Sequence, residues 1–179
     1  MKNLKMSLAA MLLMVVSLGF SQETAKMGHD HSKMEMSGMN MNDMQMPPEF
    51  KEDNLAKVYA HYEHIKIALV HANSNDAKLG ASMLSNSLKS VEGSDAASKS
   101  VKDIENAADL KSQRTAFSVL SDEMAVLVAG NLKSGMIYKD FCPMALGGGA
   151  YWLSSEKEIQ NPYFGDKMLE CGSIKEVIN

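Results

Sequence analysis

Apolar residues recur every three or four positions between residues 49 and 132, which is the spacing of one face of an α-helix. The pattern falls into four runs, at positions 55–72, 77–91, 97–108 and 110–131. The third run is the shortest and the weakest. Four amphipathic helices joined by short connections predict an antiparallel helical bundle, so the expected fold class is mainly α.

Two polar stretches separate the first three runs. The sequence NSND at 73–76 ends the first helix, and Asn75 is the expected N-cap of the second. The sequence EGSD at 92–95 ends the second helix, and Ser94 is the expected cap of the third.

The pattern changes after Gly135. MIYKDF and AYWLS have the composition of β-strands, and CPMALGGG separates them. QNPYFGD is rich in residues that favour turns. Residues 136–179 are too few to form a core alone. They are therefore expected to pack as a small loop-rich β-hairpin module on residues 49–135, within one domain.

The first 21 residues have the features of an export signal. Lys2 and Lys5 precede an apolar run, and small residues before Gln22 suit cleavage near Ser21. The apolar run is short for a membrane span. The predicted mature protein is periplasmic and has no membrane span.

Residues 22–48 contain many methionines but no valine, isoleucine, leucine or aromatic residue. Such a segment cannot bury enough apolar surface to offset its loss of conformational entropy, so it is expected to be disordered. Thioethers do not form disulfides, and a neighbouring imidazole pair can bind copper as well. The predicted flexible metal ligands of this tail are His29, His31, Met34, Met36, Met39, Met41, Met44 and Met46.

Charge excludes some classes of partner. Once Lys2 and Lys5 leave with the signal, 16 basic and 22 acidic side chains remain, a net charge of −6. An acidic chain without a basic block is not expected to bind nucleic acid.

Both cysteines have a methionine nearby. Cys142 and Met144 are two positions apart, and Met168 and Cys171 are three apart, which is one helical turn. Two thiolates and two thioethers form a soft ligand set that selects Cu(I) and, by extension, Ag(I). The alternative is a Cys142–Cys171 disulfide with the methionines as core filler. The residues by themselves leave both alternatives open.

The first helix carries three histidines away from its apolar face. His61 and His64 could chelate a metal at i, i+3 spacing, and His71 lies on the same side. The alternative is three solvated surface histidines, which is the favoured interpretation.

No sequence motif for catalysis is present. The chain has no nucleophile elbow, zinc-protease motif, phosphate-binding loop or dinucleotide fingerprint. LGGGA at 146–150 is best explained as a turn. A thiol oxidoreductase is disfavoured because the two cysteines do not form a C-x-x-C motif. The chain is therefore not expected to be an enzyme.

The C-terminal run C-P-M, then W-L-S, then N-P-Y-F-G-x-K-M-L-x-C-G resembles the signature of a secreted bacterial family of uncharacterised helical domains. KIALV at 66–70 and QRTAFSVLS at 113–121 are similar to its helical motifs. That family occurs alone or fused to periplasmic adaptor subunits of copper and silver efflux systems.

The resemblance implies metal handling, with metal ions and an efflux adaptor subunit as partners. It favours the metal over the disulfide at Cys142, Met144, Met168 and Cys171. The resulting prediction is a periplasmic buffer or chaperone for Cu(I), with Ag(I) as an alternative ion. The competing prediction is a periplasmic interaction module without metal, in which a Cys142–Cys171 disulfide fixes the C-terminal hairpin.

Overall fold

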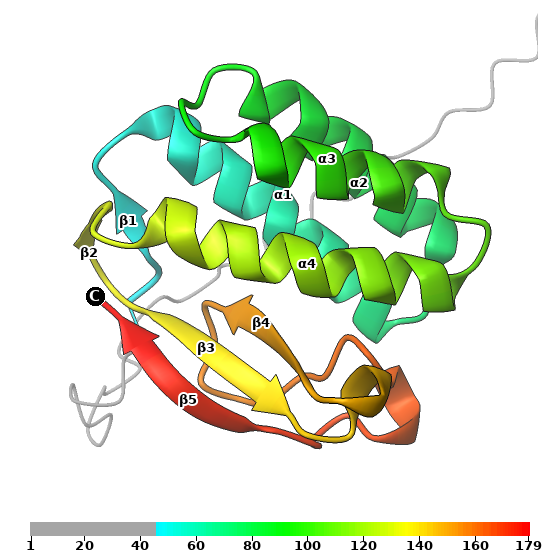
Figure 1. Ribbon diagram of the computed structural model, residues 1–179. Coiled ribbons are helices and arrows are strands. Elements are labelled where there is room, and N and C mark those ends of the chain that lie inside the picture. The colour runs from blue at the N-terminus through cyan, green and yellow to red at the C-terminus, as the bar shows by residue number, and fades with distance from the viewer. Residues whose placement is uncertain (1–45) are drawn as a thin grey trace, which may run out of the picture. The chain divides into compact units, whose positions relative to one another are not determined.

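The computed structural model describes residues 46–179, and four helices account for nearly half of them (Figure 1). Their bounds are α1 Asp53–Val70, α2 Ser74–Leu88, α3 Asp95–Asn106 and α4 Leu110–Val128. Each helix packs against the next one along the chain, and α4 also contacts α1. The predicted bundle of four helices is confirmed.

The caps of the helices differ in part from the prediction. Asn73, not Asn75, is the N-cap of α2, and its side-chain oxygen accepts a hydrogen bond from the backbone N–H of Asp76 at 3.1 Å. The connection between α1 and α2 is therefore shorter than expected. Its capping oxygen lies three residues before the N–H from which it accepts, which is the usual spacing of an N-cap. Ser94 is the N-cap residue of α3, but its hydroxyl donates to the carbonyl of Leu88 at 2.8 Å instead.

Five strands form two small antiparallel sheets. The first sheet pairs β1 Glu49–Phe50 with β2 Leu132–Ser134 across the ends of the bundle. The second has the order β4-β3-β5, with β3 Ile137–Cys142, β4 Ala150–Ser154 and β5 Ser173–Ile178. The predicted hairpin is the β3–β4 pair. The structure adds β5, whose exposed residues lack the regular alternation of a half-buried strand.

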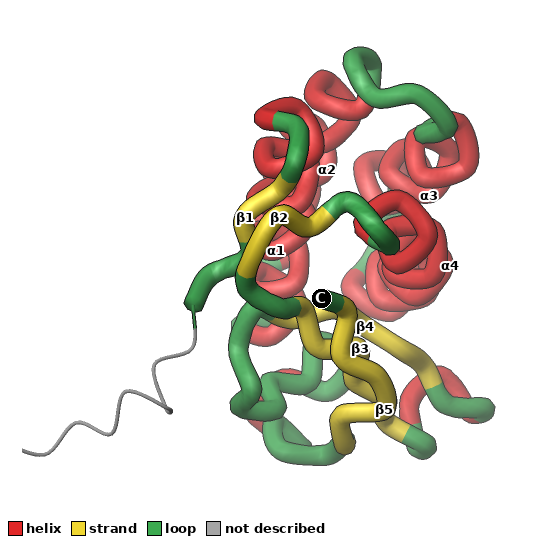
Figure 2. Tube along the Cα trace, turned by 90° about the vertical axis from the view of Figure 1, so that its left-hand side faces the viewer, coloured by secondary structure: helices red, strands yellow, loops and turns green. Residues whose placement is uncertain are grey.

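The three-stranded sheet lies under α1 and α4 as a second layer (Figures 1 and 2). Between the layers are Tyr62 of α1 and Phe117 of α4, which stack with ring centroids 5.1 Å apart and are fully buried. The Tyr62 hydroxyl also accepts a hydrogen bond from the backbone N–H of Leu153 in β4 at 2.9 Å. Strand β4 is thereby held directly on helix α1.

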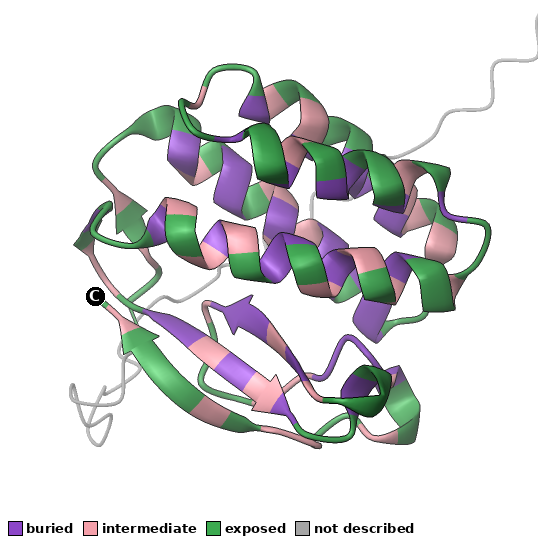
Figure 3. Ribbon diagram, in the orientation of Figure 1, coloured by how far each residue is buried: buried purple, intermediate pink, exposed green. Residues whose placement is uncertain are grey.

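Burial shows that the sheet belongs to the same core as the helices (Figure 3). The buried apolar cluster includes the inner residues of all four helices together with Ile137, Trp152 and Leu153 of the sheet. This confirms that the C-terminal segment packs on the bundle. The described residues, 46–179, all belong to one compact unit.

No helix among residues 46–179 is long and apolar enough to cross a membrane. The predicted signal at 1–21 and the tail ligands from His29 to Met44 lie outside the described residues. Of the tail ligands only Met46 is described, and it is exposed.

Candidate functional site

The two cysteines meet at one end of the three-stranded sheet. Cys142 is the last residue of β3, and Cys171 lies two residues before β5, the neighbouring strand. Their Sγ atoms are 3.1 Å apart, and both are free thiols. Cys142 is fully buried, whereas Cys171 is half-buried and reaches solvent. Strand pairing therefore brings together two thiols that are 29 positions apart in the sequence.

The separation of the sulfurs lies between two possible end states. A disulfide needs about 2.05 Å between its sulfurs. An ion bound at about 2.3 Å to each sulfur would hold them roughly 3.8 Å apart in a tetrahedral site. The observed 3.1 Å is therefore within about 1 Å of either state. The geometry allows both predicted fates of the pair.

The surroundings of Cys171 favour the protonated form of its thiol. The hydrogen bond with Cys142 and burial raise the pKa of the Cys171 thiol. A catalytic thiol needs the opposite shift, because the thiolate is the nucleophile. A bound soft cation would favour the thiolate instead, because the metal displaces the proton of a thiol that it coordinates.

An aromatic residue connects the sheet to the bundle. The hydroxyl of Tyr163 donates a hydrogen bond to the carbonyl of Tyr151 in β4, and its ring packs edge-on against Trp152 at 6.0 Å. On its other side the ring lies 6.1 Å from that of Phe117 in α4. Burial raises the pKa of Tyr163 above its ordinary value.

The two methionines occupy different environments near the thiols. Met144 precedes the short 3-10 helix η2, Ala145–Gly147, and is 59% exposed on the edge of a cleft. Met168 is half-buried and follows the 3-10 helix η3, Gly165–Lys167. The backbone N–H of Cys171 donates to the carbonyl of Met168 at 3.1 Å, so the two residues close a turn rather than sharing an α-helix.

Of the four sulfur-bearing residues predicted for the folded site, the structure brings the two cysteines into contact. The sulfur atoms of the two cysteines are within hydrogen-bond distance of each other. The methionines adjoin the pair through the chain, at two and three positions from a cysteine. Coordination by all four remains a prediction.

The histidines of α1 do not join the thiols in a group that could hold an ion within residues 46–179. His64 Nε2 lies 3.0 Å from the carboxylate of Asp76 on α2, which gives it a structural partner. His71 is the C-cap of α1 and is exposed. In the described part of the chain no three His, Cys, Asp or Glu residues gather closely enough to hold an ion.

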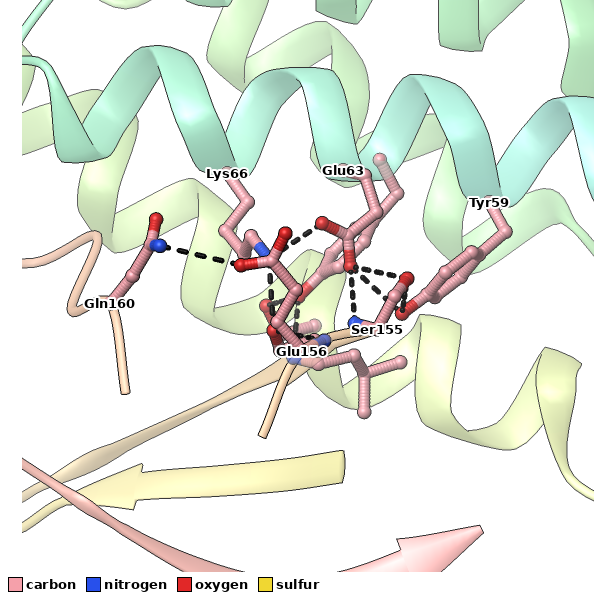
Figure 4. Close-up of polar contacts among 10 residues, drawn as sticks. Tyr59, Glu63, Lys66, Ser155, Glu156 and Gln160 are labelled. Atoms are coloured by element: carbon pink, nitrogen blue, oxygen red, sulfur yellow. Dashed lines mark hydrogen bonds and ion pairs between the residues drawn. The ribbon is translucent and has the colours of Figure 1, made fainter. Parts of the chain in front are cut away.

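A buried polar cluster between α1 and the end of β4 is not predicted by the sequence (Figure 4). The ammonium of Lys66 lies 2.5 Å from the carboxylate of Glu63 and donates to the hydroxyl of Ser154 at 3.0 Å. Glu63 also accepts hydrogen bonds from Ser155 and from the Tyr59 hydroxyl. Lys66 is almost completely buried, and its hydrogen bond to Ser154, together with that from Ser155 to Glu63, fixes α1 against the end of β4.

Asp140 of β3 adds a second carboxyl to this region. It is fully buried, and neither of its oxygens has a hydrogen-bond partner among residues 46–179. Burial raises its pKa to about 7, Glu63 acts in the same direction, and Lys66 acts against it. The one sequence signal that could have indicated the cluster is an aspartate on the inward face of an otherwise largely apolar strand.

Comparison with known proteins gives one match. Residues 58–135 match the model of a family described as a protein of unknown function (DUF3347). No curated protein and no solved structure matches the chain.

The matched residues begin in α1 and end in the turn after β2, so they comprise the helical bundle. This agrees with the expected resemblance to an uncharacterised helical domain. The cysteine pair and the remainder of the C-terminal signature lie beyond the matched residues.

Proposed function

We propose that this protein binds Cu(I), or Ag(I), at the Cys142–Cys171 pair and acts as a periplasmic buffer or chaperone in metal homeostasis or efflux. The observation that supports the proposal best is the contact of two free thiols at 3.1 Å, each with a methionine close by in the chain. Soft sulfur ligands select Cu(I) over harder ions.

The donor set distinguishes copper from zinc. A structural zinc site takes four ligands from cysteine, histidine and carboxylate side chains. No third ligand of those types joins the two cysteines within residues 46–179. Met144 and Met168 are the available thioethers, and with the two thiolates they would give Cu(I) four soft ligands. Because Cys171 reaches solvent, an ion can enter without opening the core.

The tail has a separate role in this proposal. Its histidines and methionines, His29 to Met46, would bind several ions weakly and exchange them quickly, whereas the thiol pair would hold one ion tightly. The protein would carry out no catalytic turnover, which is in keeping with the raised pKa of the Cys171 thiol. An efflux adaptor subunit is the proposed acceptor of the ion.

Cu(I) titration of the reduced mature protein against a competing chelator tests the folded site. Replacing Cys142 and Cys171 by serine is expected to abolish the tightest site. Met83→Leu, which alters an exposed methionine on α2, is the matched control and should leave the affinity unchanged. An affinity that survives the double serine variant would refute the site.

The tail is tested by its deletion. Removing residues 22–45 is expected to lower the number of ions bound while the affinity of the tightest site stays the same. Loss of the tightest site on deletion would show that the tail, not the thiol pair, provides it.

The alternative function is an interaction module without metal, fixed by a Cys142–Cys171 disulfide. The same 3.1 Å contact supports it, since the sulfurs need to approach by only about 1 Å. A thiol count on freshly purified protein and melting with and without copper separate the two functions. A closed disulfide together with a melting temperature that copper does not change would favour the module.

A further inference from the structure

A cleft of about 710 Å³ opens beside the cysteine pair, between the start of α4 and the loops that follow β3 and β4. Met144 and Leu146 line it from the η2 segment, and Tyr163 and Phe164 line it from the segment before η3. Met144 is two positions from the buried Cys142 in the chain. The cleft therefore begins next to the residue that carries the buried thiol.

The side of the cleft formed by α4 is positively charged. Lys111 and Arg114 line it, and no acidic residue does. Arg114 donates to the carbonyls of Pro162 at 2.8 Å and Leu69 at 3.0 Å, so its guanidinium is fixed in place by neutral partners. Neither cation is in an ion pair within residues 46–179. The cleft therefore has a positive charge that complements an acidic ligand.

The opposite edge of the cleft exposes apolar side chains. Met144 is 59% exposed and Leu146 is 43% exposed. Leu146 has a positive φ of 52°, a left-handed conformation that leucine rarely adopts. Holding a leucine outward in an unfavourable backbone conformation is typical of a surface that has a function.

We propose that this cleft docks a short acidic segment of a partner protein, with methionine or leucine side chains that pack on Met144 and Leu146 and carboxylates that face Lys111 and Arg114. The partner is the protein that exchanges metal with the cysteine pair, which rests on the proposed function. Docking itself does not, because the charges and apolar groups that it uses are present without metal.

Fluorescence anisotropy measures docking on the full mature chain, reduced and free of metal. The probe is a labelled synthetic peptide in which methionine alternates with glutamate. Lys111→Glu is expected to weaken its binding by about three- to tenfold, since an exposed cation is replaced by an anion. Leu146→Asn is expected to weaken it by a similar factor, and asparagine tolerates the left-handed backbone, so the fold is kept.

Two matched variants act as controls. Lys102→Glu reverses an exposed charge on α3, and Leu79→Asn removes an exposed leucine from α2. Both should bind the peptide like the wild type. Added salt should weaken binding, and a peptide with lysine in place of glutamate should not bind.

Three results would overturn docking: binding unaffected by both cleft variants, equal binding of the lysine peptide, or displacement of the peptide by a second copy of the chain. If the peptide binds but the cysteine pair takes up no Cu(I), docking stands and the proposed function fails. If Cu(I) binds tightly but the peptide does not bind, the proposed function stands and docking fails.

Discussion

The buried carboxyl of Asp140 makes a specific prediction about the pH dependence of folding. Its oxygens have no hydrogen-bond partner in the described part of the chain, so the folded state favours the neutral acid. Asp140→Asn replaces it by a group of nearly the same shape that does not ionise. The variant should therefore lose the pH dependence that this carboxyl gives to the free energy of unfolding.

The magnitude follows from the pKa, which burial raises from 3.8 to about 7. Between these values the unfolded chain releases its proton while the folded chain keeps it, so stability falls as the pH rises. The cost is about 1.4 kcal/mol for each pKa unit, or roughly 4 kcal/mol once the pH exceeds 7. Between pH 5 and pH 7 the loss amounts to about 2 kcal/mol.

Urea unfolding of the reduced, metal-free protein at pH 5, 6 and 7 measures this effect. The wild type should lose about 2 kcal/mol relative to Asp140→Asn over that range, whatever constant offset the amide adds. The exposed Asp103, changed to asparagine, is the matched control and should follow the wild type. Parallel pH profiles for the wild type and Asp140→Asn would refute the argument.

Three further predictions concern stability. Tyr62→Phe removes a buried hydroxyl that pairs with a serine of α4 and a backbone N–H of β4, and urea unfolding should show a loss of about 1–3 kcal/mol, with the two-state transition retained. Gly165→Ala should lower the free energy of unfolding by about 2 kcal/mol or more, because its φ is +59° and a Cβ would lie 2.5 Å from a carbonyl of α1. Gly93→Ala is the control, since Gly93 also has a positive φ but faces open space, and it should lower the free energy of unfolding by only about 1 kcal/mol. Equal losses for the two variants would contradict the clash. Oxidation of Cys142 and Cys171 to a disulfide should raise the free energy of unfolding by about 3–4 kcal/mol for a separation of 29 positions, and no change on reduction would show that the pair does not restrict the unfolded chain.

The helical bundle could be predicted because helix formation and burial leave the same local pattern. Apolar residues at three- and four-residue spacing coincide with the buried faces of α1 to α4. The capping error at Asn75 arose because Asn73 is also a good cap, and local sequence does not decide between them. Strand β5 was missed because four of its six residues are exposed, none is buried, and they show no alternation.

The candidate site shows the limit of the sequence more clearly. The sequence alone determined that two soft-ligand pairs exist, since residue type and spacing are local properties. Only the tertiary structure decided that Cys142 and Cys171 meet, because the pairing of β3 with β5 is a non-local contact. The same holds for the cleft at Met144 and for the burial of Lys66 and Asp140. These environments exist only where α1, α4 and the sheet pack together, and no short stretch of sequence encodes them.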